Sequence, residues 1–213
     1  MMPATRNRHQ ERSELSTARL LDAAAELIEE GGYEAMTLAA VGERAGYSRG
    51  LVTARFGSKD QLLAALVDRI TAGWSHRNVL PRTVGRPGRD GILILIDAIR
   101  AQAERDPRAL RTLYALMFEA LGPNRSLRRH FVEFHRTMRA DLAKLVRRGL
   151  RDGSIARQRR PDEEAMLLVA GLRGIAYQWR LDPDGFDPAA ALRVLGDTTE
   201  ERLRPPTMER TRR

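Results

Sequence analysis

The chain has 213 residues, a formal net charge of +9 and no cysteine, and 42% of its residues are hydrophobic. This length suits one large domain or two small ones. The lack of cysteine excludes disulfides and thiolate metal sites, and it favours a reducing, cytoplasmic location. No apolar run approaches the length of a membrane span. The arginine-containing N-terminus lacks the apolar core of a secretory signal.

The positive charge is not concentrated in the N-terminal part of the chain. Residues 1–60 contain 8 basic and 9 acidic side chains, so this part is close to neutral. A DNA-binding function must therefore depend on a local cluster of cations rather than on the net charge of a domain. One such cluster lies at residues 44–59, which contain four cations and no acid.

Apolar residues recur at helical spacing along nearly the whole chain, and no segment alternates as a strand does. The pattern predicts an all-α fold of nine helices, the first four at 14–30, 37–45, 48–56 and about 58–74. A breaker-rich linker follows at 81–88. The later helices are expected from 90 onward and at 106–121, 126–153, 161–181 and 187–203.

These helices suggest a division of the chain into functional parts. We expect a helix-turn-helix domain at 10–62, a connecting helix at 63–80 and a C-terminal effector-binding and dimerisation domain at 89–204. The short basic tail at 205–213 is expected to be disordered.

The helices at 37–45 and 48–56 are short, and only Ala45-Gly46-Tyr47 separates them. Gly46 suits the left-handed conformation that a sharp turn between packed helices requires. This arrangement is typical of a helix-turn-helix unit, whose second helix fits the major groove of DNA. Val52 and Phe56 are expected to face the core. The solvent face is then left to Ser48, Arg49, Gly50, Thr53, Ala54 and Arg55.

Arg49 lies in the first turn of the second helix, where an arginine can bond the two acceptors of a guanine. Ser48, Thr53, Arg55 and Lys59 suit phosphate contacts, and Gly50 leaves room for a DNA backbone or another helix. Two other interpretations stay open. Arg49 could bind phosphate alone, and all these cations could be solvated residues of a generic helical bundle.

Residues 17–63 resemble the N-terminal domain of TetR-family transcriptional repressors. The matching features are Leu20-Leu21-Asp-Ala-Ala, Gly32-Tyr33, Thr37-Leu38, Val41-Gly-Glu-Arg-Ala-Gly46, Ser48-Arg-Gly50, Phe56 and Ser58-Lys59. The resemblance implies that Thr37, the residues of the 48–56 helix and Lys59 contact operator DNA. The family usually has an aromatic residue where this chain has Thr53, and often histidine where it has Arg55. The phosphate contacts are therefore expected to differ.

The resemblance also implies a C-terminal helical domain that binds a small effector and forms a homodimer through its last two helices. The 161–181 helix is apolar around much of its circumference, so it must be covered on more than one side. Ala170, Gly171 and Gly174 would let another helix approach closely, and Leu192 and Leu195 offer a second face. Ordinary packing within the chain is the alternative.

An apolar effector cavity is expected where aromatic and methionine side chains gather on consecutive helices. These side chains are Trp74, Tyr114, Met117, Phe118, Phe131, Phe134 and Met138. The same set could equally form a filled core. Trp74 is expected at the end of the fourth helix, between the cavity and the DNA-binding unit.

The sequence offers no catalytic or metal-binding pattern. His130 and His135 are five residues apart, which is a poor spacing for a shared metal ion. The acidic run at 182–187 lacks the oxygen ligands of a calcium loop at Phe186 and Arg193, and no nucleophile has an evident base. We therefore expect neither an enzyme nor a metal or other cofactor.

Together these patterns predict a dimeric transcriptional regulator, most simply a repressor. It would bind a palindromic operator in double-stranded DNA and be released by a small, apolar effector, with no role at a membrane. One alternative is a DNA-binding regulator of the same fold that has no ligand. Another is a basic helical module that binds acidic partners or anionic lipid through the arginines of the 126–153 helix.

Overall fold

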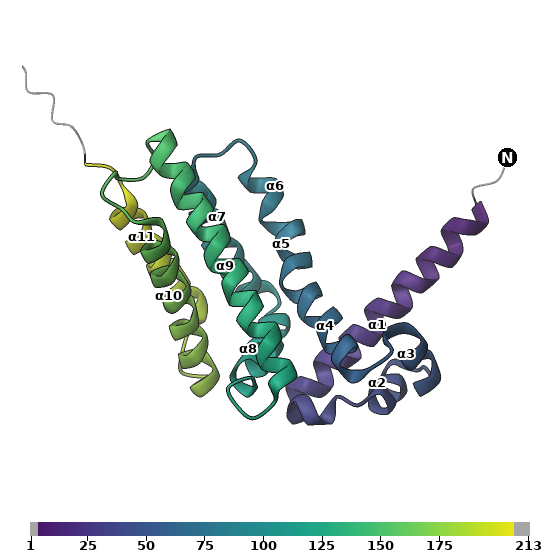
Figure 1. Ribbon diagram of the computed structural model, residues 1–213. Coiled ribbons are helices and arrows are strands. Elements are labelled where there is room, and N and C mark those ends of the chain that lie inside the picture. The colour runs from purple at the N-terminus through teal and green to yellow at the C-terminus, as the bar shows by residue number, and fades with distance from the viewer. Residues whose placement is uncertain (1–3, 207–213) are drawn as a thin grey trace, which may run out of the picture. The chain divides into compact units, whose positions relative to one another are not determined.

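The computed structural model describes residues 4–206, and within them it contains eleven α-helices and no strand (Figure 1). The prediction of an all-α fold is confirmed. Among the residues described, no helix combines the length and apolar character that crossing a membrane requires. Contacts divide the chain into two compact units. Unit 1 comprises residues 4–73 and 108–130, and unit 2 comprises residues 74–107 and 131–206.

Unit 1 is built around the first helix. It contains α1 (Ala4–Ala35), α2 (Leu38–Ala45), α3 (Arg49–Phe56), α4 (Lys59–Ile70), α8 (Arg108–Glu119) and the start of α9 (Arg125–Asp152). Helix α1 contacts α2, α4 and α8. The core consists of fully buried aliphatic side chains, among them Leu20, Ile28, Val41, Val52, Leu62, Leu66 and Leu116.

The first helix was expected to end at residue 30, but α1 continues beyond it through a kink at two glycines. Gly31 has φ −136° and ψ 15°, and Gly32 has φ 72° and ψ −174°. The positive φ of Gly32 is rarely accessible to other residues. The chain remains helical as far as Ala35, and the change of direction at the kink turns Tyr33 into the core, where it is 5% exposed.

Unit 2 is a bundle of longer helices. It contains most of α5 (Ala72–Asn78), α6 (Leu80–Thr83), α7 (Gly88–Arg105), the remainder of α9, α10 (Pro161–Leu181) and α11 (Pro188–Leu203). Helix α11 packs against both α7 and α10 (Figure 1). The main core cluster includes Ile92, Ile96, Leu142, Val146, Ile155, Leu168 and Leu203.

The last two helices have the bounds that their start signals predict. Pro161 and Pro188 lie in the first turn of α10 and α11, where a missing N–H costs nothing. The Asp187 carboxylate accepts hydrogen bonds from the backbone N–H groups of Ala189 and Ala190 at 2.9 and 3.1 Å.

The structure divides the segment that was expected to be one continuous fourth helix. Helix α4 ends at Ile70, Thr71 leaves the helical region at φ −104° and ψ −83°, and Trp74 lies in α5 instead. The Thr71 hydroxyl donates to the Val67 carbonyl oxygen at 2.7 Å. The Thr71 N–H donates to the same carbonyl oxygen at 2.9 Å, so the hydroxyl shares this acceptor with the backbone, an arrangement that often bends helices. Gly73 lowers the helix propensity further.

Two other expected boundaries also differ from the packing. The segment 108–130 packs in unit 1, although the sequence placed it within a C-terminal domain at 89–204. The linker at 81–88 contains part of a short helix, α6. Most of the tail expected at 205–213 lies outside the described residues.

Helices α7 and α9 approach each other at glycines. A Cβ atom on Gly88 would overlap backbone atoms of Leu145 and Gly149. The Gly88 N–H also donates to the Asp152 carboxylate at 2.8 Å, so the end of α9 caps the start of α7. The two backbones therefore meet without intervening side chains.

We predict that Gly88→Ala lowers the free energy of unfolding by at least about 1–3 kcal/mol, the usual cost of overpacking, because backbone atoms must move. Urea unfolding followed by circular dichroism measures the change. Gly196→Ala in α11 is the matched control, since its Cβ would meet Ile96 at an ordinary 3.7 Å. It should gain up to about 1 kcal/mol from helix propensity. Equal stability of the two variants would contradict the close approach at Gly88.

Candidate nucleic-acid interface

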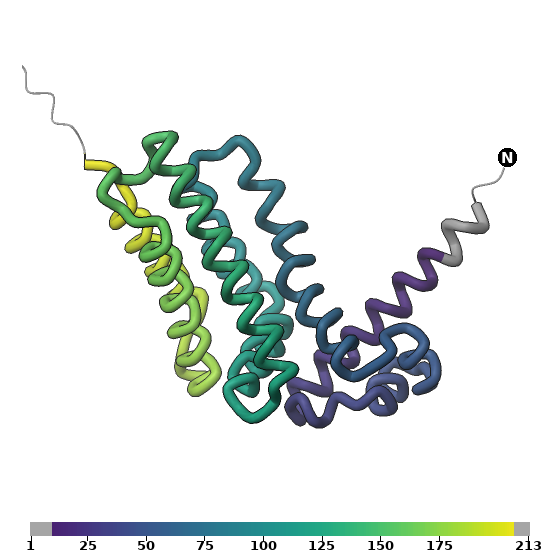
Figure 2. Tube along the Cα trace, in the orientation of Figure 1, coloured from purple at the N-terminus to yellow at the C-terminus, as the bar shows by residue number. Residues whose placement is uncertain are grey.

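Helices α2 and α3 are joined by a sharp turn that backbone conformation and capping both support (Figure 2). Gly46 is left-handed at φ 76° and ψ 29°, as predicted, and its N–H donates to the carbonyl oxygen of Glu43 at 3.1 Å. Thr37 and Ser48 cap α2 and α3 by accepting from the N–H groups of Ala40 and Leu51. The two helices therefore have fixed starts and a fixed turn.

Gly42 has a structural role that was not expected from the sequence. A Cβ atom at this position would lie 2.9 Å from the Tyr47 carbonyl oxygen and 3.1 Å from the carbonyl carbon of Ser48. Its lack of a side chain therefore lets α2 pack directly on the turn. In the sequence, only the position of Gly42, four residues before the turn glycine Gly46, could have indicated this role.

Helix α3 has the two faces that its spacing predicts. Val52 is fully buried and Phe56 is 9% exposed. The other face is open to solvent, and it presents Ser48, Arg49, Gly50, Thr53, Ala54 and Arg55. Thr37 is also exposed, and Lys59 is partly exposed at the start of α4. The eight residues expected to contact DNA are thus all accessible.

The four cations of the segment 44–59 have different surroundings. Arg44 points to α1, where it pairs with Glu30 at 2.8 Å and Glu26 at 3.4 Å. Its hydrogen bond lowers the pKa of the Glu30 carboxyl. Arg55 donates to the hydroxyl groups of Ser13 and Ser16 on α1.

Lys59 and Arg49 are the cations left for an external partner. Lys59 pairs with the exposed Glu34 at 3.3 Å and lies over the Tyr33 ring. The Arg49 side chain makes no hydrogen bond or ion pair with any residue that the structure describes. A free guanidinium in the first turn of an exposed helix can reach the edges of bases.

A two-helix unit with a glycine turn and an exposed, cationic second helix is the DNA-contacting element of helix-turn-helix proteins. Comparison with known proteins agrees. The family model of bacterial regulatory proteins of the tetR family matches residues 20–66. The C-terminal model of BetI-type transcriptional repressors matches residues 88–204, which is more than half of the chain. The chain belongs to the TetR family, and it is a transcriptional regulator rather than an enzyme.

Individual relatives support the assignment over most of the chain. The regulator BetI of Paraburkholderia phytofirmans is 28% identical over 188 residues, which cover 86% of this chain and 91% of the relative. The structure of SmeT with triclosan has a TM-score of 0.76 at 25% identity and covers 87% of this chain and 90% of SmeT. A regulator from Saccharomonospora viridis, solved with choline, has a TM-score of 0.73 at 19% identity, with coverages of 90% and 98%. The last likeness shows the fold alone.

The residues expected to line an effector cavity are divided between the two units. Tyr114, Met117 and Phe118 belong to unit 1, whereas Trp74, Phe131, Phe134 and Met138 belong to unit 2. Within unit 2, the Phe131 and Phe134 rings meet edge to face with centroids 6.3 Å apart. The Trp74 indole N–H donates to the Gln102 side-chain oxygen at 3.1 Å. The cavity itself stays a prediction.

Two polar residues beside this cluster were not expected from the sequence. Arg173 of α10 donates from Nε to His135 Nε2 at 3.0 Å, and its guanidinium lies 5.6 Å from the centre of the Phe134 ring. His135 Nδ1 must then carry the proton that bonds the Phe131 carbonyl oxygen at 2.8 Å. Burial, followed by the charge of Arg173, lowers the pKa of His135. No local pattern indicates that α9 and α10 pair these two side chains.

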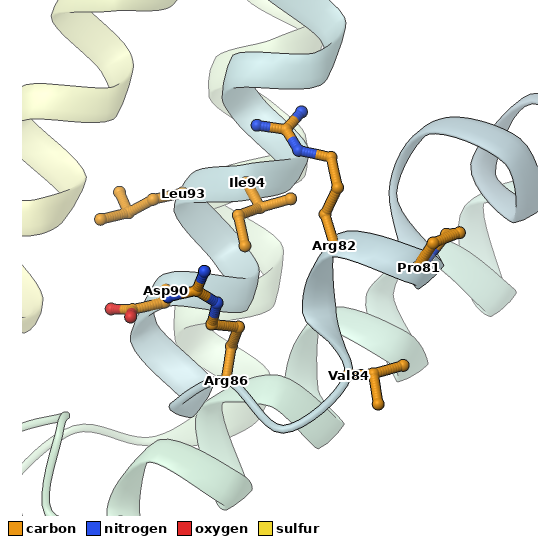
Figure 3. A pocket seen from close by; sticks show the side chains of 7 residues that line it. All are labelled: Pro81, Arg82, Val84, Arg86, Asp90, Leu93 and Ile94. Atoms are coloured by element: carbon orange, nitrogen blue, oxygen red, sulfur yellow. The ribbon is translucent and has the colours of Figure 1, made fainter.

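A pocket of about 600 Å³ opens elsewhere in unit 2, between α6 and the start of α7 (Figure 3). It combines apolar and charged side chains, namely Pro81, Arg82, Val84, Arg86, Asp90, Leu93 and Ile94. None of the seven residues of the expected cavity lines this pocket.

The residues expected at a dimer interface divide into two groups. A Cβ on Gly171 would lie 2.9 Å from Leu195 Cδ1, and Leu192 is 3% exposed, so these three residues take part in packing within the chain. Ala170 and Gly174 are exposed. Further large apolar side chains, which the sequence pattern did not single out, are exposed on the same two helices, namely Met166, Leu167, Tyr177, Leu181 and Val194.

We predict that Arg49→Ala removes about 1–3 kcal/mol of discrimination between a preferred duplex and a scrambled one, the usual worth of a bidentate base contact. Affinity for the scrambled duplex should fall less. Fluorescence anisotropy titrations of both duplexes at one salt concentration measure the difference. An equal loss on both would show that Arg49 meets only phosphate.

Proposed function

We propose that the protein is a cytoplasmic homodimeric repressor that binds a palindromic operator through α3 and leaves it when a small effector binds. The observation that carries the proposal is the exposed face of α3, where Arg49 has no partner among the described residues. A guanidinium without an internal acid can bind a base edge without first breaking an ion pair. The TetR-family assignment supports operator DNA as its partner.

The exposed apolar side chains of α10 and α11 support a dimer. Leu167, Ala170, Gly174, Tyr177 and Leu181 are spaced three or four residues apart, so they lie along one face of α10. Contiguous apolar surface of this kind marks a protein interface. A twofold copy packed on this face would form a four-helix interface. Two copies of α3 would then read two half-sites of a palindrome.

The effector is proposed to be small and largely apolar. Phe131, Phe134 and Met138 offer an apolar surface within unit 2. Arg173 places a positive charge beside the Phe134 ring. An effector held there should therefore be neutral or acidic, because this charge repels a cation such as the choline of the Saccharomonospora viridis regulator.

A regulator of the same fold without a small ligand is the second candidate. Phe131 is 3% exposed, as expected of a side chain in a filled core. No residue of the aromatic cluster lines the pocket in Figure 3. Release from DNA by a partner protein, or activation of transcription, would then replace effector control.

Selection from a random-sequence duplex library tests the proposal directly. The parent protein should retain duplexes that share an inverted repeat, and footprinting should show protection of both half-sites. Compounds bound by the structural relatives, such as triclosan, are suitable first effectors to add. Retention of duplexes without any common sequence would exclude an operator-specific regulator.

We predict that Gly174→Glu makes the protein monomeric and weakens operator binding by at least tenfold. The exposed Gly174 has open space around it in the chain, so the monomer should still fold, but an unpaired charge would be buried at the interface. Analytical ultracentrifugation measures the change. Val84→Glu, at an 80% exposed position away from this face, should remain dimeric. A dimeric Gly174→Glu protein would show that the interface lies elsewhere.

We predict that Trp74 couples effector binding to DNA release, although it lies in α5 rather than at the end of α4. An effector that breaks the hydrogen bond from Trp74 to Gln102 should shift Trp74 fluorescence while operator affinity falls. The measurement requires a Trp179→Phe background, so that a single indole reports. In that background, Trp74→Ala should still bind the operator but respond poorly to effector. A parental response would exclude this role.

A further inference from the structure

Tyr33 connects three parts of unit 1 just after the α1 kink. Its backbone N–H donates to Glu119 Oε2, at the end of α8, at 2.9 Å. Its hydroxyl group bonds Asp60 Oδ1 at 3.3 Å and also the side chain of Asn124, which caps α9. Burial, with the nearby Asp60 carboxylate, raises the pKa of this hydroxyl, so it stays a donor. Tyr33 is thus held both through its hydroxyl group and through its backbone N–H.

The face of this ring carries Lys59. The Lys59 ammonium nitrogen lies 3.9 Å from the ring centre, which is the geometry of a cation–π contact. Its other partner, Glu34, has a side chain that is 83% exposed. An exposed ion pair of this kind is weak and easily exchanged. DNA phosphate can therefore replace Glu34 while the ring continues to hold the lysine.

Glu119 fixes the position of Tyr33, and so of its ring, by accepting the hydrogen bond from the Tyr33 backbone N–H. Its carboxylate also lies close to the kink, since a Cβ on Gly32 would be 3.7 Å from Oε2. Glu119 is the last residue of α8, where the helix dipole disfavours a negative charge. The Tyr33 N–H offsets that cost, and without Glu119 this buried donor would lose its acceptor.

We propose that Glu119 and Tyr33 are positioning residues that hold the Lys59 ammonium group for its contact with DNA phosphate. The proposal rests on the proposed operator binding, and it adds that the end of α8 sets the strength of one backbone contact. A free lysine loses much rotamer freedom when it is immobilised on a phosphate. A lysine already stacked on a fixed ring loses less, so its contact is stronger.

A double-mutant cycle with Lys59 tests this role. We would compare the parent, Glu119→Ala, Lys59→Gln and the double variant by fluorescence anisotropy, using a labelled duplex that the parent retains from the random-sequence library. Lys59→Gln should reduce the slope of log affinity against log salt by about 0.9 per half-site, because one phosphate contact is lost. When Lys59 is present, Glu119→Ala should weaken DNA binding about three- to tenfold, because the partly exposed cation–π contact weakens and the Lys59 side chain becomes more mobile. In the Lys59→Gln background the same change should have almost no effect.

Two controls separate positioning from general destabilisation. Glu119→Gln keeps an oxygen that can accept the Tyr33 N–H, so its affinity and salt slope should equal those of the parent. Glu29→Ala removes an exposed glutamate elsewhere on α1 and should also match the parent. Thermal unfolding of each variant establishes that it is folded at the temperature of the titration.

Tyr33→Leu provides an independent variant if Glu119→Ala does not fold. It keeps an apolar side chain in the core but removes the ring, and it should show the same Lys59-dependent loss. Equal losses in both backgrounds would make Glu119 and Tyr33 merely structural and overturn the proposal. An unchanged salt slope in Lys59→Gln would do the same, while operator binding still stood. A parent that retains no duplex from the library would instead remove the proposed function.

Discussion

The arrangement of the DNA-binding unit depends on backbone conformations that are available to few residues besides glycine. Gly32 and Gly46 have φ angles of 72° and 76°. The first redirects α1 so that Tyr33 enters the core, and the second reverses the chain between α2 and α3. A side chain at either position would be strained whatever the space around it. Close packing adds a third requirement at Gly42, where a Cβ would press on the turn itself. The backbone therefore orients the exposed face of α3, on which Arg49 has no side-chain partner among the described residues.

Ion pairs and hydrogen bonds within this unit then determine which of its cations remain available to an external partner. Residues 1–60 are nearly neutral overall, and acids on α1 pair with three cations of this unit: Glu26 and Glu30 with Arg44, Asp22 with Arg69, and Glu34 with Lys59. Arg55 is bonded to serine hydroxyls rather than to acids, so it keeps its full charge at the α1–α3 contact. Arg49 remains unpaired among the described residues. A near-neutral domain can thus leave Arg49 without an acidic partner among the described residues, because acids on α1 pair with other cations.

The sequence predicts those parts of the structure that depend on residues close together in the chain. The turn at Gly46 is local, and the structure contains it as expected. The caps at Thr37, Ser48 and Asp187 are also local, and each is the first residue of the range that the sequence assigned to its helix. The bond between Tyr33 and Glu119 spans 86 positions, and only packing of α8 on α1 brings the two together. The break at Thr71 is local but was hidden, because the apolar spacing continues from Ile70 to Trp74. At Thr71 the backbone nevertheless leaves the helical region, at a point where the back-bonded hydroxyl and the nearby Gly73 both weaken the helix.

Different sides of the apolar helix α10 have different surroundings. Leu168 and Val169 enter the core of unit 2, and Gly171 receives Leu195 from α11. The chain covers these two sides, but a third side remains in water with Leu167, Tyr177 and Leu181 between 51% and 72% exposed. Large apolar side chains that are exposed to this extent favour removal from water. Packing within the chain therefore accounts for Gly171, Leu192 and Leu195 and leaves the Ala170–Gly174 side open. Because a glycine there puts little between the α10 backbone and an approaching helix, we propose a second copy of α10 as the partner of this side.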